Sequence, residues 1–269
     1  MAIADLAAYK LALKTHRNFP SYATTGSQVH LGRTGDSFRN ALPTPTAPTT
    51  SVVPTNATTG AVPFSNSTSG TLTCVGAQLG GNQHGVFYMY DRLVHSGGLS
   101  GTVTTAQTTN LPTAALTRYT SGEGCQIALI CHAAVGATAT TVTASYTNQA
   151  GTAGRTTVAY PIGGTGFNAV DRMLFLPLQV GDTGVRSVES VTIAATTGTA
   201  GNILVAIVKP LCAFVLDDFT TQINCNLFNS KFFGGLPEII DDASLFFLYV
   251  GTGYVSTFPL SVQLYFAEH

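Results

Sequence analysis

Residues 140–147 read TTVTASYT, and from Thr141 onward they alternate between two kinds of side chain. Val142, Ala144 and Tyr146 fall on one face of an extended chain, and hydroxyl-bearing residues fall on the other. Threonine is β-branched and suits the exposed face of a strand better than a helix. The stretch therefore predicts a strand with one buried face. The loop NQAGTAG at 148–154 then predicts a hairpin into 155–160.

Similar short runs, separated by glycine-rich turns, recur over the region 71–209. Strands of roughly 6 to 10 residues with this spacing are typical of a two-sheet β domain. The further strands that we expect here are 86–95, 125–132, 172–178, 185–196 and 203–208. The sequence thus predicts an all-β fold, with an antiparallel sandwich or jelly-roll-like domain over 71–209.

The region before this domain differs in composition. Residues 1–19 are expected to hold a short N-terminal helix, because the apolar residues of 3–14 approximate one face. Residues 20–70 are rich in Thr, Ser, Gly and Pro, and prolines such as Pro43 and Pro45 favour extended backbone. We therefore expect 20–70 to be an extended arm that lies on a partner or projects freely.

The composition changes again in the segment 210–269. Seven phenylalanines fall between residues 214 and 247, and strands are expected at 245–250 and 262–266. These strands either return to the main sheet or form a separate subdomain. An aromatic-rich segment on a charge-poor chain is also a candidate for contact between subunits.

Charge is scarce throughout. Twelve Lys and Arg and thirteen Asp and Glu make up 9% of the 269 residues, with a net charge of −1, whereas soluble domains average about 25%. Nucleic acid is a poor partner for a chain without clustered basic residues. A hydrophobic content of 45% is the reverse of a disordered chain. The densest apolar run, 245–250, is too short to span a membrane. About 40 threonines and 17 serines replace charge as the polar residues.

The five cysteines are irregularly spaced and lack a CxxC motif, which favours free, buried thiols over disulfides or a zinc site. They are Cys74, Cys125, Cys131, Cys212 and Cys225. The N-terminus lacks the basic and long apolar regions of a signal peptide, so synthesis in a reducing cytoplasm is expected.

Motifs for catalysis are incomplete. Residues 98–102 read GLSGT and approach the G-x-S-x-G elbow of serine hydrolases, but Thr102 replaces the final glycine. Gly122-Glu123-Gly124 and Gly251-Thr252-Gly253 each begin a G-x-G-x-x-G motif and lack its last glycine. We interpret all three as turns. Four glutamates and no tryptophan also disfavour a glycoside hydrolase with its paired carboxylates. We assign no catalytic or cofactor-binding residue and expect no enzyme and no cofactor.

Metal sites have only weak support. The six histidines never fall at H-x-H or H-x-x-x-H spacing. We therefore interpret each as solvated or as buried with its hydrogen bonds satisfied. They are His16, His30, His84, His95, His132 and His269. The pairs Asp217-Asp218 and Asp241-Asp242 leave a calcium site open, although adjacent carboxylates more often lie in turns or caps. No metal ligand is assigned.

Four runs, 91–108, 146–157, 181–188 and 236–243, resemble a group of tailed-bacteriophage virion proteins. The similarity covers most of the chain after about residue 60 and includes no catalytic motif. The resemblance implies a structural virion component, made in the host cytoplasm. In general character such a protein is similar to capsid cement or decoration proteins, which commonly form trimers on the major capsid shell.

The resemblance implies as partners the major capsid protein or other virion subunits, with self-association as a trimer favoured. A protein assembled in many copies can also cover uncharged surface against its neighbours, which fits the scarcity of charge. The alternative is a tail, baseplate or fibre-associated module that contacts the host surface.

Overall fold

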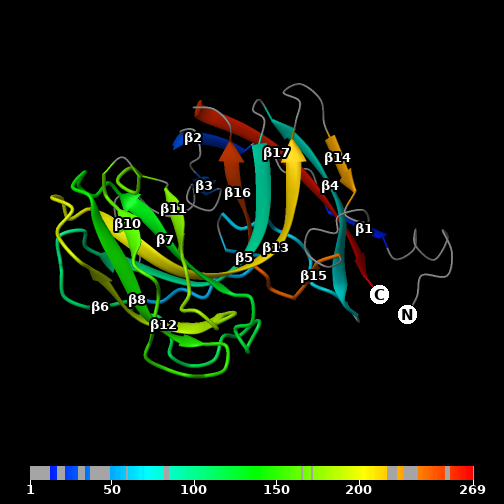
Figure 1. Ribbon diagram of the computed structural model, residues 1–269. Coiled ribbons are helices and arrows are strands. Elements are labelled where there is room, and N and C mark those ends of the chain that lie inside the picture. The colour runs from blue at the N-terminus through cyan, green and yellow to red at the C-terminus, as the bar shows by residue number, and fades with distance from the viewer. Residues whose placement is uncertain are drawn as a thin grey trace. The chain divides into compact units, whose positions relative to one another are not determined.

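The computed structural model describes residues 13–16, 22–29, 34–36, 49–58, 60–68, 70–81, 85–164, 166–170, 172–216, 223–226, 236–251 and 255–268. Within these ranges the regular structure consists of strands, joined in antiparallel pairs (Figure 1). The all-β prediction is therefore confirmed. No helix in the described part of the chain is long and apolar enough to cross a membrane.

The chain forms two compact units. Unit 1 comprises Met1–Ser37, Thr55–Tyr90 and Leu211–His269, and unit 2 comprises Phe38–Pro54 and Asp91–Pro210. Two long strands, β5 (Gly85–Leu99) and β13 (Asn202–Leu216), pass from one unit into the other.

Unit 2 is an antiparallel sandwich. One sheet has the order β10-β8-β12-β6, with β9 paired to β8, and is named here the β8 sheet. Facing it are β11, β7 and the unit 2 parts of β13 and β5, in that order, named here the β7 sheet. The bounds are β6 (Gln107–Thr108), β7 (Gln126–Ala133), β8 (Thr140–Asn148), β9 (Arg155–Thr156), β10 (Tyr160–Ile162), β11 (Met173–Leu176) and β12 (Val185–Ile193).

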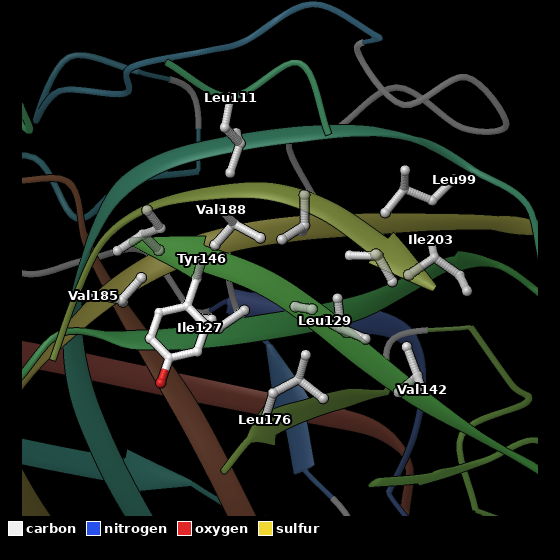
Figure 2. Close-up of a cluster of buried hydrophobic side chains, with 14 of the residues drawn as sticks. Leu99, Leu111, Ile127, Leu129, Val142, Tyr146, Leu176, Val185, Val188 and Ile203 are labelled. Atoms are coloured by element: carbon white, nitrogen blue, oxygen red, sulfur yellow. The ribbon is translucent and has the colours of Figure 1, made fainter. Parts of the chain in front are cut away.

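The core of unit 2 lies between these sheets. Val142 and Tyr146 of β8 point into the same cluster as Ile127 and Leu129 of β7 and Ile203 of β13 (Figure 2). All five side chains are fully buried. Fully burying an aliphatic side chain of this size contributes roughly 1.5–3 kcal/mol, so this cluster makes a large contribution to the unit's stability.

The two sheets have different sequence patterns for a physical reason. Strand β8 alternates between buried and partly exposed residues because only one of its faces is covered. In β13 the run 203–208 reads ILVAIV, and all six residues are buried. A strand covered on both faces has no polar side, so its apolar run is continuous.

Unit 1 is organised around a third sheet. Its order is β1-β17-β4-β14, with β2 paired to β17 and β15 to β4. Strand β16 pairs with β3. The bounds are β1 (Leu13–His16), β2 (Tyr22–Val29), β3 (Thr34–Asp36), β4 (Leu72–Gly81), β14 (Ile223–Asn226), β15 (Glu238–Ile239), β16 (Leu245–Gly251) and β17 (Val255–Glu268).

The two N-terminal segments expected from the sequence are placed only in part. The predicted helix falls mainly on residues 1–12, outside the described ranges, and the residues that follow form β1. In the segment 20–70, expected as an extended arm, Tyr22–Val29 and Thr34–Asp36 pair with strands β17 and β16 of the same chain. The first of these stretches contains no proline and is rich in residues that favour strands.

Four phenylalanines of the C-terminal segment pack within unit 1. Phe246 stacks on Tyr90 with ring centroids 5.5 Å apart, and Phe247 lies 6.1 Å from Phe214. Phe266 contacts Phe64 at 5.8 Å. The four phenylalanines 214, 246, 247 and 266 are buried, so they belong to the core of this unit rather than to an exposed contact surface.

Candidate functional site

Three loops of unit 2 are joined to one another at one end of the sandwich. They are residues 119–125, 148–155 and 177–184, and together they are named here the loop end. Glu123 and Gly184 form an isolated β-bridge, and the Gln149 backbone N–H donates to the Gly184 carbonyl at 3.2 Å. Arg186 joins two of the loops, because its Nε donates to the Ser121 and Gln149 carbonyls at 3.1 and 3.0 Å. The loops therefore form one connected surface.

The carboxylate of Asp182 is the centre of this surface. Arg155 Nε and Nη2 donate to it at 2.9 and 3.2 Å, Asn148 Nδ2 at 2.7 Å and the Tyr146 hydroxyl at 2.5 Å. Four donors thus saturate its two oxygens. The hydrogen bonds from Arg155, followed by that from Tyr146, lower the pKa of Asp182 to about 2. Burial, together with the hydrogen bond to Asp182, raises the pKa of Tyr146.

The turn 179–182 presents an apolar side chain to solvent. The Asp182 N–H donates to the Gln179 carbonyl at 3.0 Å, and Gly181 has φ +92°, as a type II turn requires at its third position. The Gln179 N–H donates to the Tyr146 hydroxyl at 2.9 Å. Val180, the second residue of the turn, is 92% exposed. It is therefore held in the open by a turn that is anchored on both sides.

An open pocket of about 420 Å³ lies beside this turn. Phe175, Leu176, Pro177 and Leu178 supply its apolar wall. Its remaining lining residues are Gly124, Cys125, Gln126, Asp182 and Thr183. Because Asp182 is saturated and the Thr183 hydroxyl donates to Glu123 at 2.9 Å, these two groups are already engaged within the protein. Burial raises the pKa of the Cys125 thiol to about 12, so it is not a nucleophile at neutral pH.

The outer face of the β8 sheet carries a row of hydroxyl groups, and the carboxylate of Glu189 accepts a hydrogen bond from one of them, that of Thr147. Thr141, Thr143, Ser145 and Thr147 of β8 are all partly exposed on this face, here named the hydroxyl face. Their neighbours continue the pattern, since Ser190 of β12 pairs with Ser145 on one side and with Thr108 on the other. The sequence pattern of 140–147 is therefore expressed as a row of hydroxyls across the sheet.

Charged side chains of unit 2 are engaged internally. Asp91 pairs with Arg118 and Asp182 with Arg155. Glu189 accepts hydrogen bonds from Thr147 and Ser187, and Lys209 donates to the Glu123 carbonyl. The ten charged residues that the structure describes in Asp91–Pro210 all have a partner inside the protein: Asp91, Arg92, Arg118, Glu123, Arg155, Arg172, Asp182, Arg186, Glu189 and Lys209.

The ion pair between Asp91 and Arg118 lies next to residues 52–54, which form the end of the first segment of unit 2. Arg118 is 6% exposed and Asp91 is fully buried, and the guanidinium meets the carboxylate through two bonds of 2.8 and 2.9 Å. The same Nη2 donates to the Pro54 carbonyl at 3.1 Å. The backbone N–H of Val52 donates to the His95 carbonyl, and the backbone N–H of His95 donates to the Val52 carbonyl. Burial and the charge of Arg92 lower the pKa of His95 to about 3, which leaves this histidine neutral.

The first two motifs considered for catalysis lie at or next to turns, and the third is described only at its first residue. Ser100 Oγ lies 3.0 Å from Thr102 Oγ1, and the Ser100 N–H donates to Gln107 Oε1. Gly122 and Gly124 have φ +69° and +67°. Ser100, Gly122 and Gly124 therefore help to set the conformation of loops. Gly251 ends β16, and residues 252–253 lie outside the described ranges.

The candidate metal ligands among the described residues are not brought together into a cluster. Asp241 and Asp242 each bind the segment 66–67, since Asp241 Oδ1 accepts the Ser67 N–H at 2.7 Å and Asp242 Oδ1 accepts Asn66 Nδ2 at 2.8 Å. The described residues contain no group of three or more His, Cys, Asp or Glu that could hold a metal ion. Asp217 and Asp218 lie outside the described ranges, as do His30, His84 and His269.

The remaining histidines and the cysteines are placed as follows. His95 and His132 are buried in unit 2, and His16 belongs to β1. Cys74, Cys125, Cys131 and Cys212 are free and buried, which confirms the thiol prediction for these four. Cys225 is part of β14.

Sequence reasoning missed the loop end. Its parts are far apart in the chain, and Asp182 lies 27 residues from Arg155 and 36 from Tyr146. The available signal was the pair of glycine-rich loops at 148–154 and 181–184, which mark tight turns but do not say that the turns meet.

Comparisons with known proteins give only remote likenesses. No family model and no curated protein matches the chain. The VP2 subviral particle of infectious bursal disease virus is similar at 10% identity, over 96% of this chain and 82% of that chain, with a TM-score of 0.18. The Gt strain of the same virus gives 9% identity, 95% and 82% coverage and a TM-score of 0.16. This likeness to viral particles is too weak to establish a shared fold, and the tailed-phage group expected from the sequence is not among these similar structures.

Proposed function

We propose that the chain is a non-enzymatic structural protein of a tailed-bacteriophage virion, acting as a capsid cement or decoration protein that binds and stabilises the major capsid shell. Its partners are then the major capsid protein and further copies of itself, with a trimer favoured. The resemblance of the runs 91–108, 146–157, 181–188 and 236–243 supports the virion assignment.

One observation carries the proposal. The ten described charged residues of Asp91–Pro210 all have internal partners, and the hydroxyl face and the loop end are poor in charge that is free of such partners. The centres of protein interfaces are depleted of charged residues, whereas surfaces exposed to solvent need charged residues for solubility. Unit 2 therefore has the surface of a subunit that other subunits cover.

Particles made with and without this chain test the proposal. Quantitative mass spectrometry against the major capsid protein should give on the order of hundreds of copies per particle, as a closed shell of repeated subunits requires. Shells that lack the chain should dissociate at a lower temperature and recover when purified protein is added. Unchanged shell stability would contradict the cement role. A copy number in the tens or fewer would instead favour the tail, baseplate or fibre alternative.

A further inference from the structure

One edge of unit 2 is covered by a short segment from earlier in the chain. In the β7 sheet β5 is the last strand; β16, the next strand of the full sheet, belongs to unit 1, and at His95 the edge of β5 is occupied by Val52. The two residues exchange both backbone hydrogen bonds, at 2.9 and 3.0 Å, as an isolated bridge. Residues 49–54, named here the strap, therefore take the position of a further strand without continuing the ladder.

The strap is held through its backbone. Asn110 Nδ2 donates to the Thr49 carbonyl at 3.0 Å, and Arg118 Nη2 donates to the Pro54 carbonyl at 3.1 Å. Together with the two bonds of Val52, these are the hydrogen bonds that the strap makes within the described part of the chain. Its side chains are exposed or half-buried, apart from that of Pro54. Because the strap buries little apolar surface, its release requires much less free energy than unfolding of the sandwich.

The edge beneath the strap lacks the features that protect the other edges of unit 2. Strand β10 carries Pro161, β11 has four residues and β6 has two. A proline or a very short edge strand hinders pairing with a strand of another chain. Strand β5 has fifteen residues with neither proline nor lysine, and its stretch 93–97 contains no Asp, Glu, Lys or Arg. The protection of this edge therefore comes from the strap.

We propose that the strap is an autoinhibitory cover, which occupies the β5 edge at His95 in the free subunit and whose release opens this edge to strand addition. Strand addition uses backbone hydrogen bonds, the same kind that hold the strap, so the strap and an incoming strand compete for one site. In purified protein the incoming strand is the same edge of a second copy, since two identical edges pair antiparallel about a two-fold axis. The inference concerns the free subunit and does not rest on the proposed virion function.

Sedimentation of the purified full chain tests the cover. Val52→Pro removes the N–H that donates to the His95 carbonyl, and Asn110→Gly removes the donor to the Thr49 carbonyl while glycine accepts the φ of 56° found there. Both variants should form larger species than the wild type at the same concentration, with cooperative thermal unfolding retained. Val52→Ala is the matched control: it keeps both backbone bonds and should sediment as the wild type does. Wild-type sedimentation of both Val52→Pro and Asn110→Gly would overturn the inference.

Hydrogen exchange measured by mass spectrometry locates the opened edge. In the wild type the His95 amide should exchange faster than the Leu129 amide of β7, because the strap opens without unfolding of the sandwich. In dilute Val52→Pro the His95 amide should exchange roughly tenfold faster than in the wild type, as the loss of about one hydrogen bond predicts. In the associated form of this variant, residues 93–97 should regain protection. Equal protection of His95 and Leu129 in the wild type, or association that leaves 93–97 unprotected, would overturn the inference.

Discussion

Replacing Arg118 by alanine should strongly destabilise unit 2. The guanidinium makes two bonds to the fully buried Asp91 and one each to the Arg92 and Pro54 carbonyls, at 3.0 and 3.1 Å. Removing one partner of a buried ion pair costs about 3–5 kcal/mol, because the remaining charge stays buried. We therefore expect Arg118→Ala to lower the free energy of unfolding by this amount.

Urea unfolding followed by far-UV circular dichroism measures the loss, and two further variants define its cause. Arg155→Ala is the matched control: its side chain is 27% exposed, and its partner Asp182 retains Tyr146 and Asn148 as donors, so a smaller loss is expected. The double variant Asp91→Leu with Arg118→Met should recover much of the stability, since no buried charge remains. The reasoning is refuted if Arg118→Ala loses less than about 1 kcal/mol, which is the range of an exposed pair.

Three further predictions concern the glycines, the thiols and the carboxylate of unit 2. Gly184→Ala should prevent the loop end from forming and lower the melting temperature, because a Cβ would lie 2.0 Å from a backbone oxygen, whereas Gly166→Ala, with its closest contact at 3.5 Å, should be tolerated. Cys125, with its pKa of about 12, should resist iodoacetamide at pH 8 in the native protein and react only after unfolding; rapid native labelling would show that the thiol is not buried. Carbon-13 NMR should show Asp182 titrating near pH 2 rather than at its usual value near 3.8, so that its stabilising contribution is complete above pH 3.8 and lost as the pH falls through about 2. Arg155→Met should raise this midpoint, and an unchanged midpoint would contradict the assigned cause.

The sandwich of unit 2 was predictable because its strands follow simple rules of periodicity. The pattern of 140–147 predicts β8, and the loop 148–154 does lead into a strand that pairs back on it, with Ser145 opposite Thr156. The apolar run 203–208 predicts part of β13. Strand β6 was not predicted, because a two-residue strand has no periodicity to detect.

The pairings of unit 1 and the loop end were not predictable in the same way. Strand β2 pairs with β17, which lies more than two hundred residues away in the sequence, and neither stretch contains a local signal that identifies its partner strand. The network of Asp182 likewise depends on three turns that meet only after the sheets have formed. Local sequence specifies which residues extend and turn, whereas long-range register follows from the burial of matching faces.

A cryo-electron microscopy reconstruction of the particle tests the central claim most directly, since that claim is that other virion subunits cover the charge-poor surface of unit 2. The account predicts density for the sandwich on the capsid shell, with the hydroxyl face or the loop end in contact with neighbouring subunits. Density confined to the tail, or a sandwich on the shell whose hydroxyl face and loop end both lie open to solvent, would contradict it.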